Sequence, residues 1–362
     1  MFWTKRTYLD IAAGVSGNPS SPHEEGRHAK KMLEDARTDI ARLTEVQSDD
    51  VIFTSGATEA NALAILGILK TGDHAFYLPS AHASIVENMK LASERGVEIG
   101  ALPIADGRVD CKKLKELLRP QTKLVAMDAV CGETGIIWNT REVKQTIGAD
   151  VLLHVDASQA PLTEKISRAH FGADMMVLDA SKVGEVRGIG ALIAHRTIPL
   201  EPLYRGGGQE RGLRPGSEAP ELAREFARAL RSAVFGRERF HTVAEKERTR
   251  LIAGITATIP NVFIHEGRSQ VPNILNLSLP GRDTDYLVAL LDEEGFAVST
   301  RSACETDSEE GSRAVLALTG DAEHARATLR ISWGSSIGKY ELSHFAKALA
   351  RAVVFIDNSS QG

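Results

Sequence analysis

The chain has 362 residues, more than a single hydrophobic core usually spans, so we expect one large domain and a smaller one. Its composition, with 43% hydrophobic and 25% charged residues, is that of an ordinary globular protein. The net charge of -5 and the lack of a long Lys/Arg run argue against nucleic acid or an anionic membrane as a main partner.

The N-terminal segment MFWTKRTYLD lacks the apolar centre of a signal peptide, and no run of about 18 apolar residues predicts a membrane span. We therefore expect a cytoplasmic protein without a membrane partner. Cys111, Cys131 and Cys304 are odd in number and have no CxxC spacing, which argues against a disulfide framework and a structural zinc site. Free thiols and no metal are predicted.

From about residue 28, amphipathic helical stretches alternate with short apolar runs, the pattern of a parallel sheet covered by helices. The apolar stripe of the first helix is formed by Met32, Leu33, Ala36, Ile40 and Leu43. Strands are predicted at Val51–Phe53, Ala75–Leu78, Lys123–Met127, Val151–Val155, Met175–Leu178 and Ile189–Ala194. An α/β fold follows from this alternation.

Near Pro260 the pattern changes to a long helix, a strand pair at 273–279 and 296–300, and a C-terminal helix from about Tyr340. We interpret this part as a second, smaller α+β domain. The predicted division is a large domain over residues 16–230 and a small domain made of residues 1–15 and 231–362.

Two residues that follow predicted strands could hold the two ends of one aromatic cofactor. Asp156 ends the apolar run in HVDASQ, and Lys182 follows the next strand in DASKVGEVRGIGAL. Pyridoxal 5'-phosphate needs an amine that bonds its aldehyde and a carboxylate that keeps its ring nitrogen protonated. The alternative is that Lys182 is a solvated loop residue.

Other segments allow similar double interpretations. The strand-to-helix turn at 55–58 in TSGATEAN offers free backbone N–H groups and the Thr58 hydroxyl to a phosphate, or is a plain helix cap. His82 follows a strand and could stack on a cofactor and move protons, or be an ordinary loop residue. Arg330 lies in a predicted strand and could grip a carboxylate, or lie at the surface.

Cys304 lies in VSTRSACETDSEEGS, a stretch without apolar periodicity. A thiol outside the core is poorly explained by packing, which favours a reactive role. The Gly-rich segment 206–217, GGGQERGLRPGS, suits a loop that approaches an anion closely.

Taken together and in this order, these segments resemble the class V, fold type I pyridoxal phosphate enzymes, and most closely the cysteine desulfurases. The motifs that carry the resemblance run through most of the chain: YLD, GNPSS, FTSGATEAN, HVDASQ, the Lys before GIGAL, GGGQERGLRPGS, PNILNLS, SAC and LRIS. The resemblance implies an aminotransferase-like large domain with a mainly parallel sheet, and a smaller α+β domain that carries the catalytic Cys loop.

The resemblance also implies a pyridoxal 5'-phosphate cofactor and a role for each matching residue. Lys182 would bind the cofactor covalently, Asp156 would pair with the pyridine nitrogen, and Gln159 would bind the phenolic oxygen. His82 would stack on the ring and move protons. The other cofactor-binding residues would be Ala57, Thr58, Ser181 and, across the interface of a homodimer, Ser217.

On the substrate side, Arg330 and Asn18 would bind L-cysteine, with Arg330 on the α-carboxylate. Cys304 would attack the substrate sulfur, so the products would be L-alanine and a persulfide on Cys304. The long stretch after Cys304 resembles the subgroup that passes sulfur directly to acceptor proteins, such as an iron–sulfur scaffold or a tRNA-thiolation protein. The implied function is a pyridoxal phosphate-dependent cysteine desulfurase.

Two other functions stay open. One is a related class V lyase or aminotransferase that acts on another amino acid, including selenocysteine, and activity that survives Cys304→Ala would favour it. The other is a non-catalytic relative that serves as a binding subunit.

The chain departs from the family pattern at several positions. Asp179 and Ser181 stand where the family has Ser and His, and Cys131-Gly132 replaces paired Asn. A carboxylate about 4 Å from a phosphate charge costs roughly 4 kcal/mol per charge pair at an effective dielectric near 20. We therefore expect Asp179 to turn away, to be protonated, or to weaken cofactor binding. The segment between YLD and GNPSS is also short, and Arg301 replaces a small residue near Cys304.

Overall fold

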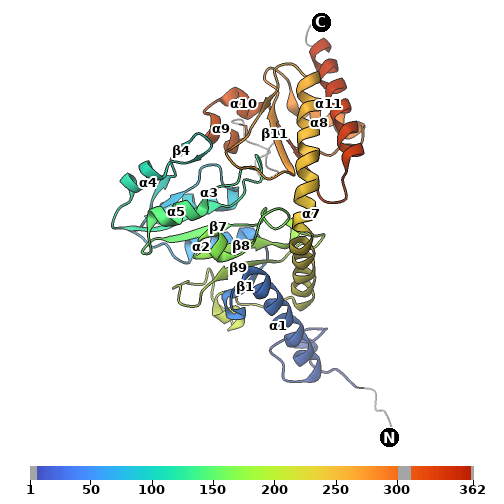
Figure 1. The fold of residues 1–362 in the computed structure, drawn as a ribbon. Helices are drawn as coiled ribbons and strands as arrows, with labels where there is room; N and C mark the ends of the chain where they lie inside the picture. Colours follow the sequence, from blue (N-terminus) through green and yellow to red (C-terminus); the bar gives the residue numbers. More distant parts are fainter. Residues whose placement is uncertain (1–5, 301–310, 360–362) are drawn as a thin grey trace.

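A computed structural model describes residues 6–300 and 311–359 of the chain (Figure 1). Its main element is a seven-stranded sheet with the strand order β1-β9-β8-β7-β6-β2-β3. The strands are β1 Val51–Thr54, β2 His74–Tyr77, β3 Glu98–Ala101, β6 Thr122–Asp128, β7 Leu152–Asp156, β8 Met175–Asp179 and β9 Gly190–Ala194. Strand β9 runs antiparallel to the other six strands, which are parallel to one another. The predicted α/β fold with a mainly parallel sheet is confirmed.

Helices alternate with these strands, as the apolar pattern predicts. They are α1 Glu24–Thr44, α2 Ala57–Leu66, α3 Ala83–Glu94, α4 Cys111–Leu117, α5 Thr140–Ile147 and α6 Arg168–Phe171, with a small hairpin of β4 Ile104–Ala105 and β5 Arg108–Val109. The interior strand β9 is buried along its whole length, as expected for a sheet covered on both faces. The predicted stripe of α1 includes Leu33, Ala36 and Ile40, all buried.

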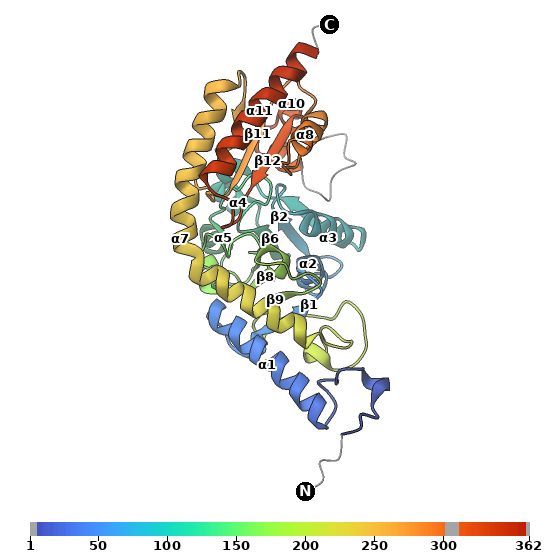
Figure 2. The same cartoon turned by 90° about the vertical axis from the view of Figure 1, so that its right-hand side faces the viewer.

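A single long helix, α7 Pro220–Thr258, runs from α1 to the C-terminal part of the chain (Figures 1 and 2). Its first part, with Phe226 and Leu230, packs into the core of the large sheet. Its second part, with Leu251 and Ile255, packs into a separate apolar core. The long helix predicted near Pro260 lies before that residue and ends at Thr258. The domain division at residue 230 stays a prediction, because α7 contributes to both cores.

The second core is built on a three-stranded antiparallel sheet of β10 Phe263–Ile264, β11 Ile274–Ser278 and β12 Thr328–Ser332. The described residues of this part also form the helices α8 Thr284–Glu293, α9 Arg313–Thr319, α10 Ala322–Arg326 and α11 Lys339–Ser359. The strand predicted at 296–300 is wrong, since this segment forms only an isolated bridge from Ser299 to Arg330. Strand β11 pairs with β12 instead, which buries Leu277 and Leu329 in the second core.

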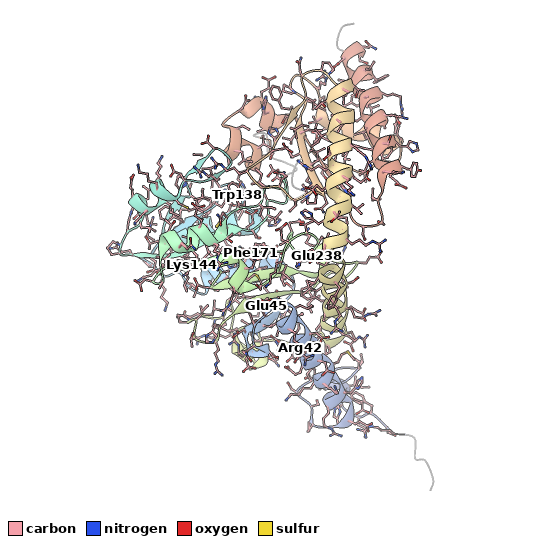
Figure 3. All side chains as sticks on the ribbon, viewed as in Figure 1. Arg42, Glu45, Trp138, Lys144, Phe171 and Glu238 are labelled. Carbon is pink, nitrogen blue, oxygen red and sulfur yellow. The ribbon has the colours of Figure 1, made fainter. Side chains whose placement is uncertain are left out.

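Local polar contacts fix the approach to the central strand β7. Lys144 of α5, labelled in Figure 3, donates to Asp174 Oδ2 over 2.7 Å and to Val151 O over 2.8 Å. Asp174 Oδ2 also accepts from the backbone N–H of Leu153. The start of β7 is thereby tied to α5. Across residues 6–300 and 311–359, every helix is too short or too polar to cross a bilayer.

Candidate active site

A cavity of about 300 Å³ lies at the carboxyl ends of the parallel strands. Because parallel strands end at the same edge of a sheet, residues that follow β2, β6, β7 and β8 meet there. The predicted residues that line the cavity are Ala57, Thr58, His82, Asp156, Gln159, Ser181, Lys182 and, from β12, Arg330. The arrangement brings together a carboxylate, an amine, an imidazole and a guanidinium.

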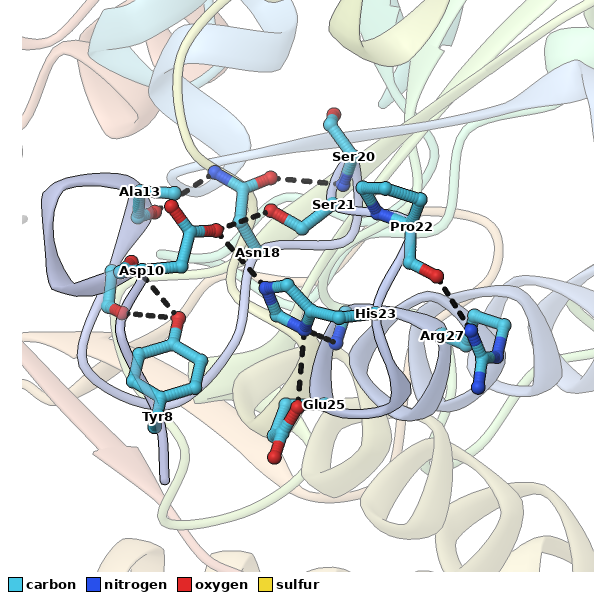
Figure 4. Close-up of polar contacts among 12 residues, drawn as sticks. Tyr8, Asp10, Ala13, Asn18, Ser20, Ser21, Pro22, His23, Glu25 and Arg27 are labelled. Carbon is cyan, nitrogen blue, oxygen red and sulfur yellow. Dashed lines mark hydrogen bonds and ion pairs between the residues drawn. The ribbon is translucent and has the colours of Figure 1, made fainter. Parts of the chain in front are cut away.

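Among the described residues, two predicted site residues, Asn18 and Ser217, do not line this cavity. Asn18 lies in the N-terminal loop, where its Nδ2 donates to Ala13 O and its Oδ1 accepts from Ser20 N (Figure 4). Ser217 lines a separate small cavity beside Phe53. Its predicted role toward a partner subunit is not tested by a single chain. Cys304 lies outside the described residues.

Asp156 is held in place by two hydrogen bonds. Its Oδ1 accepts from the backbone N–H of Ser158 over 2.9 Å, and its Oδ2 accepts from Asn61 Nδ2 over 2.7 Å. Asn61 is fully buried on α2, and its Oδ1 accepts from His154 Nε2 over 2.7 Å. Since burial lowers the pKa of His154 to about 4, this ring is neutral at pH 7.

The same Asn61 amide connects Asp156 to His82. Asn61 Nδ2 also donates to Ser84 Oγ over 2.8 Å, and Ser84 Oγ lies 2.8 Å from His82 Nδ1. His82 Nδ1 accepts from the Ser84 backbone N–H as well, as the cap of α3. The network therefore assigns the unprotonated nitrogen of His82 to Nδ1 and leaves Nε2 to carry a proton.

Three buried polar atoms on the cavity wall have no hydrogen-bond partner within the described part of the chain. They are Ser80 Oγ, Ser158 Oγ and Asp128 Oδ1. Buried polar groups in proteins are almost always satisfied, so orphaned atoms that line a cavity indicate a polar ligand there. Burial, followed by the nearby charge of Asp156, raises the pKa of Asp128 well above its usual range.

Cys131 and Gly132, which stand where the family has paired Asn, also line the cavity. The Cys131 thiol is 1% exposed and points its Sγ toward Ser80 O at 3.7 Å. Burial, with the nearby Asp128, raises the pKa of this thiol to about 12, so it is not a thiolate at neutral pH. Gly132 O accepts from Arg330 Nη1 over 3.3 Å, which positions the guanidinium at the cavity.

The N-terminus of α2 is occupied by a side chain of the protein itself. Asp179 Oδ2 accepts from the backbone N–H of Ala57 over 2.7 Å. Asp179 Oδ1 accepts from both the N–H and the hydroxyl of Ser181, over 2.8 and 2.7 Å. Of the outcomes expected for Asp179, turning away from the helix is therefore wrong.

Asn61, Ser80, Ser84, Asp128 and His154 belong to the site but were missed by the sequence reasoning. Asp128 had a usable signal, because it ends the apolar run KLVAMD as Asp156 ends its own. The others had none, since Asn61, Ser84 and His154 act through contacts between α2, α3 and β7, and Ser80 lies in the loop after β2.

Comparison with known proteins identifies the family. A family model described as aminotransferase class-V matches residues 6–343. This chain belongs to the aminotransferase class-V family. A protein named cysteine desulfurase IscS 1, from Archaeoglobus fulgidus, is 30% identical over 88% of this chain and 85% of its own length. The resemblance to cysteine desulfurases inferred from the motifs is thus confirmed.

Solved structures of class-V relatives have the same fold. A NifS-like protein is 28% identical, with a TM-score of 0.86 over 94% of this chain and 92% of its own. A structure titled SspA in complex with cysteine is 26% identical, with a TM-score of 0.74 over 87% of this chain and 90% of its own.

Class-V enzymes typically use pyridoxal 5'-phosphate, and the cavity fits one end of that group. Asp156, Lys182 and Gln159 supply the carboxylate, amine and amide that a pyridoxal ring requires, and the orphaned hydroxyls of Ser80 and Ser158 lie beside them. The phosphate end does not fit in the same way. The Ala57 N–H that would meet a phosphate at the start of α2 already donates to Asp179.

Proposed function

We propose that this class-V protein is a cysteine desulfurase, which converts L-cysteine to L-alanine and carries the sulfur as a persulfide on Cys304. The observation that carries the proposal is the convergence of Lys182, Asp156 and Arg330 on one cavity, in a chain that also has the SAC motif. A bound pyridoxal group supplies an electron sink for the substrate's Cα.

The residues of the cavity have distinct tasks in this reaction. Arg330 binds the α-carboxylate of cysteine in a bidentate fashion. Lys182 accepts the proton from the substrate Cα. His82, whose Nδ1 is held by Ser84, presents a proton on Nε2 for transfer at the cavity.

Cys304 performs the sulfur transfer. Its thiolate attacks the substrate sulfur, so that an S–S bond forms and the Cβ–S bond breaks, with the electron pair remaining on the substrate carbon. A proton added at Cβ, and the return of a proton from Lys182 to Cα, then complete L-alanine. The persulfide would pass to a sulfur-acceptor protein, such as an iron–sulfur scaffold or a tRNA-thiolation protein, and the enzyme would act as a homodimer in the cytoplasm.

The first test is the visible spectrum of the purified protein with pyridoxal 5'-phosphate and with pyridoxal, before and after L-cysteine. We expect an absorption band that is absent in Lys182→Ala and changes with cysteine, together with equal amounts of alanine and sulfur. Cys304→Ala should abolish alanine formation without removing the band. Cys111→Ala, at the partly buried start of α4, is the matched thiol control. Alanine formation by Cys304→Ala would overturn the proposal and favour another class-V lyase.

A further inference from the structure

The start of α2 contains an anion that belongs to the protein. Asp179, the last residue of β8, lies across from Gly56, and a Cβ added to Gly56 would come within 3.2 Å of Asp179 Oδ2. The carboxylate thus fits the space that this glycine leaves open, at the positive end of a helix of ten residues.

The Asp179 carboxylate is well satisfied where it lies. It accepts three hydrogen bonds, one from Ala57 N and two from Ser181. Moving it aside would break all three and leave the Ala57 N–H to find another acceptor. A second anion at the same helix end would therefore have to displace Asp179 or share its donors.

The charges around the cavity also oppose a phosphate dianion. Apart from Asp128, whose pKa is raised by burial, its wall includes the carboxylates of Glu133, Asp156 and Asp179, against the cations Lys182 and Arg330. In the proposed reaction, Lys182 bonds the cofactor and Arg330 binds the substrate. Neither cation is then left to neutralise a phosphate.

By contrast, the ring end of the cavity contains polar groups that the other described residues leave unsatisfied. Ser80, Asp128 and Ser158 are each at most 5% exposed and each has a polar atom without a partner among the described residues. These atoms lie beside Asp156, whose carboxylate is already oriented by Asn61 and the Ser158 N–H. A pyridine ring with hydroxyl and hydroxymethyl groups could satisfy them.

We propose that Asp179 takes the place of the cofactor's phosphate, so that this protein binds phosphate-free pyridoxal at least as tightly as pyridoxal 5'-phosphate. The inference rests on the proposed function only in requiring a pyridoxal group at Lys182. Asp179 is then a specificity-determining residue, which selects the cofactor by charge and by occupation of the α2 N-terminus.

The test measures equilibrium binding of pyridoxal and of pyridoxal 5'-phosphate by absorbance titration. Both compounds are titrated into the natural chain and into Asp179→Ser. In the natural chain, the dissociation constant for pyridoxal should be equal to or lower than that for pyridoxal 5'-phosphate. In Asp179→Ser, affinity for the phosphate form should rise roughly a hundredfold to a thousandfold, the scale expected for removing a charge pair near 4 Å. Affinity for pyridoxal should change less than about threefold.

A second readout does not depend on covalent binding. Inorganic phosphate should raise the melting temperature of Asp179→Ser but not of the natural chain, because only the variant has a free anion site. Asp179→Asn removes the charge and keeps an acceptor oxygen. This variant therefore distinguishes repulsion by the Asp179 charge from occupation of the α2 N-terminus by its side chain. The matched control is Asp150→Ser, an exposed carboxylate two residues before β7 and so at the opposite sheet edge.

The outcomes separate this inference from the proposed function. If the natural chain binds pyridoxal 5'-phosphate more tightly than pyridoxal, the inference fails while the desulfurase proposal stands. An unchanged preference in Asp179→Ser would also overturn it. If neither compound binds to either protein, both proposals fail. If the natural chain prefers pyridoxal as expected but forms no alanine from L-cysteine, only the proposed function is overturned.

Discussion

Asp128 and Asp156 lie directly opposite each other at the ends of the parallel strands β6 and β7, and both side chains are buried. Asp156 accepts hydrogen bonds on both oxygens, whereas Asp128 Oδ1 has no partner among the described residues. Two adjacent buried carboxyl groups do not both ionise readily. Asp128 therefore holds the proton, since its pKa is raised by burial and by Asp156.

This assignment predicts how stability depends on pH. In the unfolded chain an Asp loses its proton near pH 4, whereas folded Asp128 keeps it to higher pH. Above pH 4 the folded state thus binds more protons, so this group lowers the free energy of unfolding as pH rises. Asp128→Asn should match the natural chain near pH 4 and become more stable above it, by about 1.4 kcal/mol per pH unit up to the folded pKa.

Urea unfolding at several pH values between 4.5 and about 8 measures this difference. Asp150→Asn, which removes an exposed carboxylate, controls for the change in net charge. Parallel stability curves for Asp128→Asn and the natural chain would show that Asp128 is ionised in the folded protein.

Asn61 is expected to be a positioning residue for two site groups at once. Its amide donates to Asp156 and to Ser84, and accepts from His154. Asn61→Ala should lower the free energy of unfolding by about 3 kcal/mol, because buried groups that lose their partner cost about 1–3 kcal/mol each. It should also weaken binding of pyridoxal, since Asp156 loses its orientation.

The matched control is Asn88→Ala on α3, which removes one hydrogen bond from Asn88 Nδ2 to Ser84 O and should cost about 1 kcal/mol. Chemical unfolding and absorbance titration measure the two effects. Equal losses in both variants, or unchanged pyridoxal affinity in Asn61→Ala, would contradict the positioning role.

Much of this arrangement could be predicted from the sequence, because the strands are short apolar runs that end in polar residues. Asp156 and Lys182 were found in this way, and the structure brings them to one cavity. Asn61 could not be found, because its position in α2 is apolar by context and its partners lie up to 95 residues away in the chain. The sequence placed the partner strand of β11 at 296–300, whereas the partner is β12. Both segments are apolar enough to form a strand, so the pattern alone could not choose between them.

A buried ion pair anchors the Gly-rich loop to α1. Arg37 donates to both oxygens of Glu210 over 2.7 Å, and Glu210 Oε2 also accepts from Phe53 N. Removing Glu210 leaves the buried Arg37 guanidinium with the half-exposed Glu34 as its one charged partner in the described part of the chain, so Glu210→Ala should cost about 3–5 kcal/mol. Lys31→Ala, which removes an exposed pair with Asp35, should cost less than about 0.5 kcal/mol. A loss below about 1 kcal/mol in Glu210→Ala would show that the loop is not held by this pair.

Because of His265, we expect the free energy of unfolding to fall as the pH is lowered. Its Nε2 donates to Ser278 Oγ over 2.6 Å, because the Ser278 hydroxyl itself donates to His324 O. Burial, with the nearby His324, lowers the pKa of His265 from 6.5 to about 4. Between these values the unfolded chain binds the additional proton, so the stability that His265 contributes above pH 6.5 is lost as pH falls toward 4.

The loss from this one residue should be about 1.4 kcal/mol per pH unit, or roughly 3 kcal/mol over the window. In His265→Gln, which keeps a donor for Ser278, the difference in unfolding free energy between pH 7 and about 4.5 should shrink by most of this amount. His28→Gln, at an exposed position of α1, should leave that difference unchanged. If His265→Gln loses as much stability in acid as the natural chain, the prediction is wrong. The imidazole of His265 would then take up its second proton in the folded state as readily as in the unfolded chain.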